Sequence, residues 1–276
     1  MKTKNWEELT FADNFMFCMI LEHNPDICRK LLELLLHIKI EKLEVPESER
    51  TLQQDFDSKS VRFDVYTKDE KRIFDLEMQT TNSRNLPKRA RYYQSIIDVD
   101  NLSKGENYTK LKDSYVIFLC MHDIFKKKLP VYSFENICHE DSSLKLNDRT
   151  FKLFFNAESC DKLKSTEEKD FFNFLKGNTA QTELSKDIQE KVFLAKKNKR
   201  WRRQYMTWQQ TIDEEKEIAR EEGLAEGKAE GSREARLEAA RNLLKMNLLT
   251  PEQIAQAAGL STKQVLELKK ELSEQS

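Results

Sequence analysis

The pattern of apolar and polar positions divides the chain into a mixed N-terminal part and a helical C-terminal part. Apolar residues recur at helical spacing over 5–38, and Asn24-Pro25 interrupts this pattern and starts a second helix. Strand patterns follow over 38–45, 61–79 and 113–123. The last of these is a continuous apolar run, which is typical of a strand buried on both faces.

The remaining elements complete a mixed α/β core over roughly residues 5–175. A helix starts at Pro87 and ends near Gly105, and two further strand patterns lie within 128–140 and 149–157. From Glu167 onward the pattern is helical to the end of the chain. The predicted fold is therefore a mixed sheet flanked by helices, followed by an all-helical C-terminal extension.

The stretch from Val61 to Thr80 predicts a β-hairpin with a polar face. Because side chains alternate along a strand, Asp75, Glu77 and Gln79 share one face of the second strand. A two-residue loop places Asp64 of the first strand directly opposite Glu77, and a four-residue loop makes the two residues diagonal neighbours. Their β-carbons would then lie about 5 Å or about 7–8 Å apart.

Two carboxylates at that separation can hold one divalent cation. Mg²⁺ prefers a few carboxylates together with water and phosphate oxygens, and such a site suits phosphodiester hydrolysis. The alternative is a polar face directed to solvent, with Arg62 or Arg72 paired to the acids. The spacing by itself is compatible with both interpretations.

Composition narrows the class of protein. The formal net charge is −1, which argues against a uniformly basic nucleic-acid-binding surface but leaves room for two basic clusters, at 84–91 and 196–203. The five cysteines include no CxxC pair, so we expect reduced thiols. With no membrane-length apolar run and no secretory h-region at the N-terminus, we expect a cytoplasmic protein without a membrane segment.

The C-terminal third has two notable features. Gly223, Gly227 and Gly231 recur every four residues in a charged, Ala-rich helix. They indicate either a solvated helical linker or a seam of small residues for a partner helix. Residues 250–272 then predict two short helices, with capping-box patterns starting at Thr250 and Ser261. Such a helix-turn-helix pair is compatible with DNA binding and with packing or dimerisation.

The residues of the hairpin also resemble a known family. "RFDVY" followed by "EMQ" resembles the PD-(D/E)XK nuclease superfamily, and the chain is similar to its recombination-promoting nuclease (Rpn) and transposase family. The similarity includes "FADNFMFCMILEHNPDICRKLLELLL", "SYVIFLC" and "YSFENIC", in the same order and spacing. It covers most of residues 8–210 and loosely the rest.

The resemblance implies a restriction-endonuclease-like core and a metal-dependent DNA endonuclease. Asp64 and Glu77 match the acids that bind Mg²⁺, for which Mn²⁺ can substitute, and Asp13 is a candidate for a further ligand. Gln79 lies at a catalytic position where many members have lysine. The residues expected to contact DNA lie on the next helix and are Arg89, Arg91, Tyr93 and Gln94.

Two positions depart from the pattern of the superfamily. Phe63 precedes Asp64 where the nominal residue is proline, and this is a loosely kept feature. Gln79 replaces lysine and supplies no charge, although its amide can still orient a water molecule.

The chain is thus expected to contain a nuclease-like core (1–175), a basic helical segment (176–212), a charged linker (213–241) and a helical pair (242–276). The alternative function is a catalytically weak or inactive nuclease-fold scaffold that binds DNA or protein through its helical C-terminal tail. In either case the C-terminal helices are candidates for homo-oligomerisation.

Overall fold

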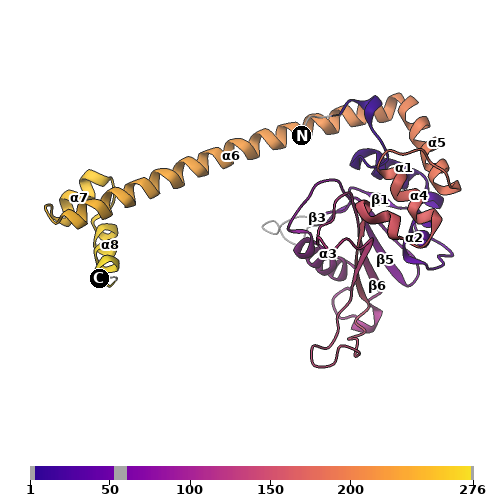
Figure 1. Ribbon diagram of the computed structural model, residues 1–276, viewed down its shortest axis with the longest axis horizontal. Helices are drawn as coiled ribbons and strands as arrows, with labels where there is room; N and C mark the ends of the chain where they lie inside the picture. The colour runs from indigo at the N-terminus through magenta and orange to yellow at the C-terminus, as the bar shows by residue number, and fades with distance from the viewer. Residues whose placement is uncertain (1–3, 53–60, 275–276) are drawn as a thin grey trace. The chain divides into compact units, whose positions relative to one another are not determined.

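A computed structural model describes residues 4–52 and 61–274 of the chain. The chain forms two compact units, Met1–Tyr205 and Met206–Ser276, and helix α6 (Lys199–Met246) contains the boundary between them (Figure 1). Each unit has a buried apolar cluster of its own. The finer division of the chain given above stays a prediction.

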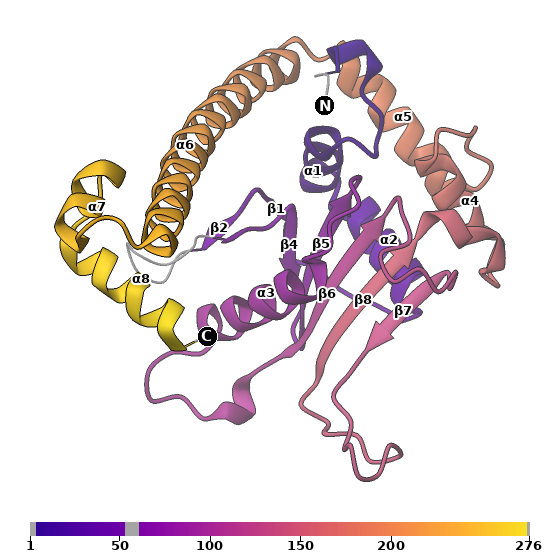
Figure 2. The same cartoon turned by 60° about the vertical axis from the view of Figure 1, so that its left-hand side comes forward.

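The first unit is built on a six-stranded mixed sheet with the order β1-β4-β5-β6-β8-β7 (Figure 2). Its strands are β1 (Glu47–Ser48), β4 (Val65–Lys68), β5 (Arg72–Gln79), β6 (Asp113–Cys120), β7 (Val131–Phe134) and β8 (Thr150–Asn156). The central strands β5, β6 and β8 are parallel, and the outer strands pair antiparallel with them or with each other. A separate two-stranded sheet joins β2 (Thr51–Leu52) to β3 (Val61–Arg62). The predicted mixed sheet is confirmed.

The hairpin of β4 and β5 has the register of the two-residue loop. Val65 pairs with Leu76 and Tyr66 with Asp75, and Asp69 closes the turn by accepting from and donating to Arg72. Continued by one residue, this register places Asp64 opposite Glu77. Of the two arrangements that the sequence allowed, the direct one is therefore the one that forms.

Helices cover both faces of the sheet. On one face α3 (Leu86–Asp100) packs Ala90 and Ile97 into the cluster around Phe118. On the other face Phe172 of α4 (Thr166–Leu175) stacks on Phe155 of β8, with 5.6 Å between ring centroids. The helices α1 (Asn14–His23), α2 (Pro25–Leu36) and α5 (Glu183–Lys197) pack with α4 in this second layer (Figure 2). Three short 3₁₀ helices are Trp6–Glu8, Tyr108–Lys110 and Ala157–Lys162.

The strand predicted over 38–45 does not form, and that prediction is wrong. Ile40 is the buried residue of this segment, and its backbone amide donates to the side chain of Glu33 at the end of α2. Glu44 donates one backbone hydrogen bond to Lys68, and Pro46 then has no amide to offer a ladder. The side chain of Ile40 is therefore buried although its segment does not pair as a strand.

The second unit is a small helical core. The end of α6 packs against α7 (Pro251–Ala258) and α8 (Thr262–Glu274) around Ala240, Ile254 and Val265. Both predicted capping boxes form: Thr250 and Gln253 exchange hydrogen bonds of 2.9 and 3.3 Å, as do Ser261 and Gln264. Gly259 ends α7 with a φ of +64°, a left-handed conformation that glycine adopts without strain.

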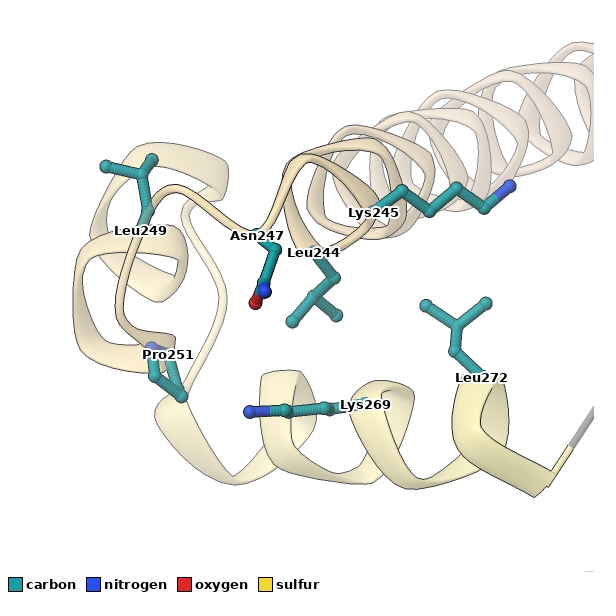
Figure 3. Close-up of a pocket in the computed structure, with 7 residues that line it drawn as sticks. All are labelled: Leu244, Lys245, Asn247, Leu249, Pro251, Lys269 and Leu272. Carbon is teal, nitrogen blue, oxygen red and sulfur yellow. The ribbon is translucent and has the colours of Figure 1, made fainter. Parts of the chain in front are cut away.

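A hollow of ≈ 280 Å³ lies between the end of α6 and α8 (Figure 3). Its lining is apolar with two lysines and consists of Leu244, Lys245, Asn247, Leu249, Pro251, Lys269 and Leu272. Earlier on α6, Gly223, Gly227 and Gly231 have no atom within 4 Å of where a β-carbon would lie. Packing within the described chain therefore does not require glycine at these three positions.

Among the described helices, none has the length and apolar character needed to cross a membrane.

Candidate active site

The candidate site lies at the carboxyl end of β5, where four segments of the first unit meet. Asp64 lies in the interruption between β3 and β4, and Glu77 and Gln79 are at the end of β5. Asn14 is the first residue of α1, and Arg89 is in the first turn of α3. The starts of two helices therefore face the end of a central strand.

Asp64 and Glu77 are joined through backbone amides. The amide of Asp64 donates to Oε1 of Glu77 at 2.9 Å, and the amide of Met78 donates to Oδ2 of Asp64 at 2.9 Å. These two bonds take the place of ladder hydrogen bonds at the point where the strand is interrupted. The hairpin thus fixes both carboxylates next to each other.

Asp64 is further held from α1. The side chain of Asn14 hydrogen-bonds its carboxylate, and the thiol of Cys18 donates to its backbone carbonyl at 3.2 Å. Burial raises the pKa of the Asp64 carboxyl, while the hydrogen bonds from Met78 and Asn14 oppose this rise. Asn14 and Cys18 were not among the residues singled out from the sequence, because nothing in their spacing marks them.

Glu77 is fully buried and forms an ion pair with Arg89. Its Oε2 accepts from Nη2 of Arg89, and Nε of Arg89 donates to the hydroxyl of Tyr93 at 2.8 Å. The guanidinium also lies over the Tyr93 ring, 4.9 Å from its centroid. Burial and the charge of Asp64 raise the pKa of Glu77 to about 8, although Arg89 acts in the opposite direction.

Gln79 has both ends of its side-chain amide engaged. Its Nε2 donates to the carbonyl and hydroxyl oxygens of Thr81 at 2.6 and 2.9 Å. Its Oε1 accepts from Nη1 of Arg89 at 3.3 Å and retains a second lone pair. The position expected to carry lysine thus holds a neutral group in contact with the Arg89 cation.

The polar face of β5 is buried, so the solvent-facing alternative is wrong. Asp75 and Glu77 are 0% exposed and Gln79 is 7% exposed. The cation that contacts Glu77 and Gln79 is Arg89. It is neither Arg62, which is exposed, nor Arg72, which pairs with Asp69. The sequence could not show this, since α3 approaches from outside the hairpin.

Asp75 is a buried acid without a hydrogen-bond donor. Neither of its carboxylate oxygens accepts from an N–H or hydroxyl donor, and the group within hydrogen-bonding reach is the carboxyl of Glu77, two residues away on the same face of β5. Burial, followed by the negative charge of Glu77, raises the pKa of Asp75 well above its ordinary value. The site therefore has more buried carboxyl groups than cations.

Three further predicted site residues have environments of their own. The carboxylate of Asp13 contacts Lys4 and Thr10, at 2.6 and 2.7 Å. Gln94 is buried and donates to the hydroxyl of Ser114, and its contact with DNA stays a prediction. Arg91 is exposed on α3, where a phosphate backbone can reach it.

The donor set of the acid pair fits a hard divalent cation. Asp64 and Glu77 offer carboxylate oxygens, and the buried Asp75 carboxyl group without a donor indicates that this face of β5 has few positive partners for its acids. Over residues 4–52 and 61–274 there is no cluster of three or more His, Cys, Asp and Glu side chains suited to a metal. Asp64 and Glu77 would thus be the protein ligands, with water and substrate oxygens completing the shell.

The comparison with protein families agrees with this geometry. A family model described as "PD-(D/E)XK nuclease family transposase" matches residues 13–229. The chain belongs to this family, and the resemblance identified from the sequence is confirmed. No curated protein and no solved structure matches the chain.

Proposed function

We propose that the chain is a Mg²⁺-dependent endonuclease that hydrolyses phosphodiester bonds in DNA, and that Mn²⁺ can replace Mg²⁺. Its role would lie in recombination or in the movement of mobile elements. The observation that carries this proposal is the pairing of Asp64 with Glu77 at the carboxyl end of β5, in a chain of a nuclease family. The exposed α3 surface beside this pair supports access by a large substrate.

Each residue has a distinct role in the proposed reaction. Asp64 and Glu77 hold the cation, which when bound polarises the phosphate and lowers the pKa of water. Gln79 orients the attacking water through the free lone pair of its Oε1. The water gives up a proton to solvent as its oxygen bonds to phosphorus. The bond from phosphorus to one sugar oxygen breaks, and that oxygen leaves with the electron pair and takes up a proton from solvent. Arg91 contacts a neighbouring phosphate without reading sequence.

The C-terminal unit supports a second part of the proposal, which is homo-oligomerisation through its helices. It has its own core, and large apolar side chains such as Leu248 and Leu266 are 77% and 51% exposed. Truncation after Ile212 keeps Tyr205, whose ring packs on Trp6 and Phe15. We expect the truncated chain to keep the fold of the first unit and to have a lower mass by light scattering. An unchanged oligomeric state would exclude these helices as the interface.

We place the activity in the cytoplasm, in keeping with cysteines that are all free thiols.

Plasmid nicking with Mg²⁺ or Mn²⁺ tests the enzyme against the inactive scaffold. Asp64→Asn and Glu77→Gln keep the shape and the acceptor oxygens of the acid pair, so loss of cleavage in these variants reflects lost charge rather than lost folding. We expect both to cut at least about 100-fold more slowly than wild type. Equal rates for wild type and both variants would favour the scaffold, with DNA binding as the remaining function.

A further inference from the structure

We propose that Arg89 supplies, from helix α3, the positive charge at the scissile phosphate that Gln79 cannot supply. This inference rests on the proposed nuclease function. It assigns Arg89 a catalytic contact with the reacting phosphate rather than a general contact with the DNA backbone.

The guanidinium of Arg89 lies between the residue that replaces lysine and one of the acids. Nη1 of Arg89 lies 3.3 Å from Oε1 of Gln79, and Nη2 pairs with Oε2 of Glu77. The cation therefore contacts both the residue that replaces lysine and the adjacent acid. Among the described lysine and arginine side chains, the one that forms an ion pair with either of the two acids is Arg89, which pairs with Glu77.

The guanidinium is held in a fixed orientation. Nε donates to the Tyr93 hydroxyl at 2.8 Å, and the guanidinium carbon lies 4.9 Å from the Tyr93 centroid and 5.3 Å from the Phe118 centroid. Three of the five N–H groups are thus used within the protein, which leaves one on each terminal nitrogen for a ligand. A rigid fork with two remaining donors matches the oxygens of a phosphate.

The guanidinium is more exposed to solvent than Glu77, so a substrate can reach it first. The Arg89 side chain is 35% exposed, whereas Glu77 is 0% exposed. A phosphate that approaches from solvent therefore meets the guanidinium before it meets the carboxylate. During hydrolysis negative charge grows on the non-bridging oxygens, and the free N–H groups of Arg89 donate to them. No bond to Arg89 forms or breaks, and its protonation does not change.

The same contact gives Arg89 a measurable effect on metal binding. In this structure Oε2 of Glu77 accepts from Arg89, so a cation held by Glu77 competes with the guanidinium for that oxygen. Loss of the arginine should therefore slow cleavage while leaving Mg²⁺ affinity equal or higher. An arginine with a purely structural role would lower both together.

Four chains provide the test: Arg89→Met, Gln79→Lys, the double variant, and Arg149→Met as a matched control. Arg149 also pairs with a carboxylate and lies over a ring, but at the opposite end of the sheet. Removal of one donor to a transition-state oxyanion typically slows turnover about 10²–10³-fold, and we expect this loss in Arg89→Met. Gln79→Lys serves as the reference for the double variant, in which the added lysine charge should restore at least about tenfold of the rate that Arg89→Met loses. The control should cut like wild type.

Metal binding provides the second measurement. Calorimetric titration with Mg²⁺, without DNA, should give Arg89→Met an affinity equal to or above that of wild type.

Cleavage by Arg89→Met at the wild-type rate would overturn the inference. So would a folded double variant that does not regain activity, or a parallel loss of metal affinity. If Arg89→Met does not fold, Arg89→Lys decides the question. It keeps the charge but loses the fork, so we expect a partial loss of rate of up to about tenfold, and a larger loss in a folded chain overturns the inference that position 89 supplies charge. Equal cleavage by wild type and Asp64→Asn would instead reject the proposed function itself.

Discussion

Asp64 and Glu77 are linked by a 2.9 Å hydrogen bond from the backbone amide of the first residue to the carboxylate of the second. The carboxylate of Asp64 in turn accepts from the amide of Met78. The acids therefore take the place of backbone acceptors in an interrupted ladder, and their separation follows from the register of the hairpin. Removal of either side chain to alanine would leave a backbone amide without its acceptor, so loss of activity in an alanine variant would have two causes.

The raised pKa of Glu77 predicts that Mg²⁺ binding depends on pH. A carboxyl with a pKa of about 8 in the folded protein is mostly protonated at neutral pH, and the proton must leave before the cation binds. Affinity should rise as the pH rises through this value, by about tenfold between pH 7 and pH 9. Calorimetry in buffers of different ionisation enthalpy measures both affinity and proton release. A pH-independent affinity, or the same dependence in Glu77→Gln, would contradict this assignment.

Asp75 predicts a pH-dependent contribution to stability. Its pKa is raised in the folded state, so the folded chain holds a proton that the unfolded chain releases as the pH rises above about 4. The stability linked to this proton is complete at low pH and is lost as the pH rises toward the folded pKa. Asparagine is neutral throughout, so Asp75→Asn should match wild type near pH 4 and exceed it near pH 9. A gain of about 1 kcal/mol would raise the Tm by about 2–4 °C.

Thermal unfolding at the two pH values checks this prediction. Asp161→Asn provides the control, because it makes the same chemical change at an exposed aspartate of the first unit. The prediction would be wrong if Asp75→Asn lost stability at pH 9, or if the control showed the same gain.

Asn14 and Asp13 are adjacent residues, but we expect their substitution to affect cleavage differently. Asn14 hydrogen-bonds Asp64, whereas the carboxylate of Asp13 contacts Lys4 and Thr10. Asn14→Ala should raise the pKa of Asp64 further and slow cleavage about 10–100-fold at neutral pH, because a hydrogen bond to a charged group contributes about 1.5–3 kcal/mol net. Asp13→Asn should have the smaller effect on cleavage. A loss in Asp13→Asn as large as that in Asp64→Asn would restore Asp13 as a metal ligand.

Gly227 separates the two interpretations of the glycine repeat. No atom lies within 4 Å of its missing β-carbon, and it lies in the interior of α6. If the segment is a solvated linker, Gly227→Ala should increase helicity and stabilise the helix by about 1 kcal/mol, without a change in mass. Circular dichroism and sedimentation measure the two quantities. A fall in oligomer mass would instead identify a seam for a partner helix.

The sequence was sufficient to predict the position of the acid pair, because that position depends only on residues that are close together in the chain. Alternation along two adjacent strands and the parity of their loop bring Asp64 opposite Glu77, and the structure has that register. The parallel strand over 113–120 and the two capping boxes are also set by local patterns. The segment 38–45, which does not form the predicted strand, shows the limit of such patterns. The backbone amide of its one buried residue, Ile40, donates to a side chain of α2 rather than to a neighbouring strand.

The environment of the acids could not be predicted, because it depends on packing between distant segments. The sequence suggested that Arg89 contacts DNA, but its pairing with Glu77 requires α3 to lie on the same face of the sheet as the acids. For the same reason, Asp75 resembled a solvent-exposed residue in the alternating pattern and is instead fully buried. Asn14 follows Asp13 by one residue, and the turn that begins α1 decides which of the two reaches Asp64.

Helix α6 has a consequence for how the folding of this chain is measured. Every residue from 213 to 236 is exposed within the described chain, so no apolar packing holds that stretch in place. Its helicity is then an equilibrium set by local propensity, as in an isolated peptide, and it should melt gradually with temperature. The sheet-containing unit should instead unfold in one sharp transition. The ellipticity at 222 nm therefore combines two processes, whereas the fluorescence of Trp6, with Trp201 and Trp208 replaced by phenylalanine, follows the unit that contains the acids, because Trp6 is buried against Tyr205.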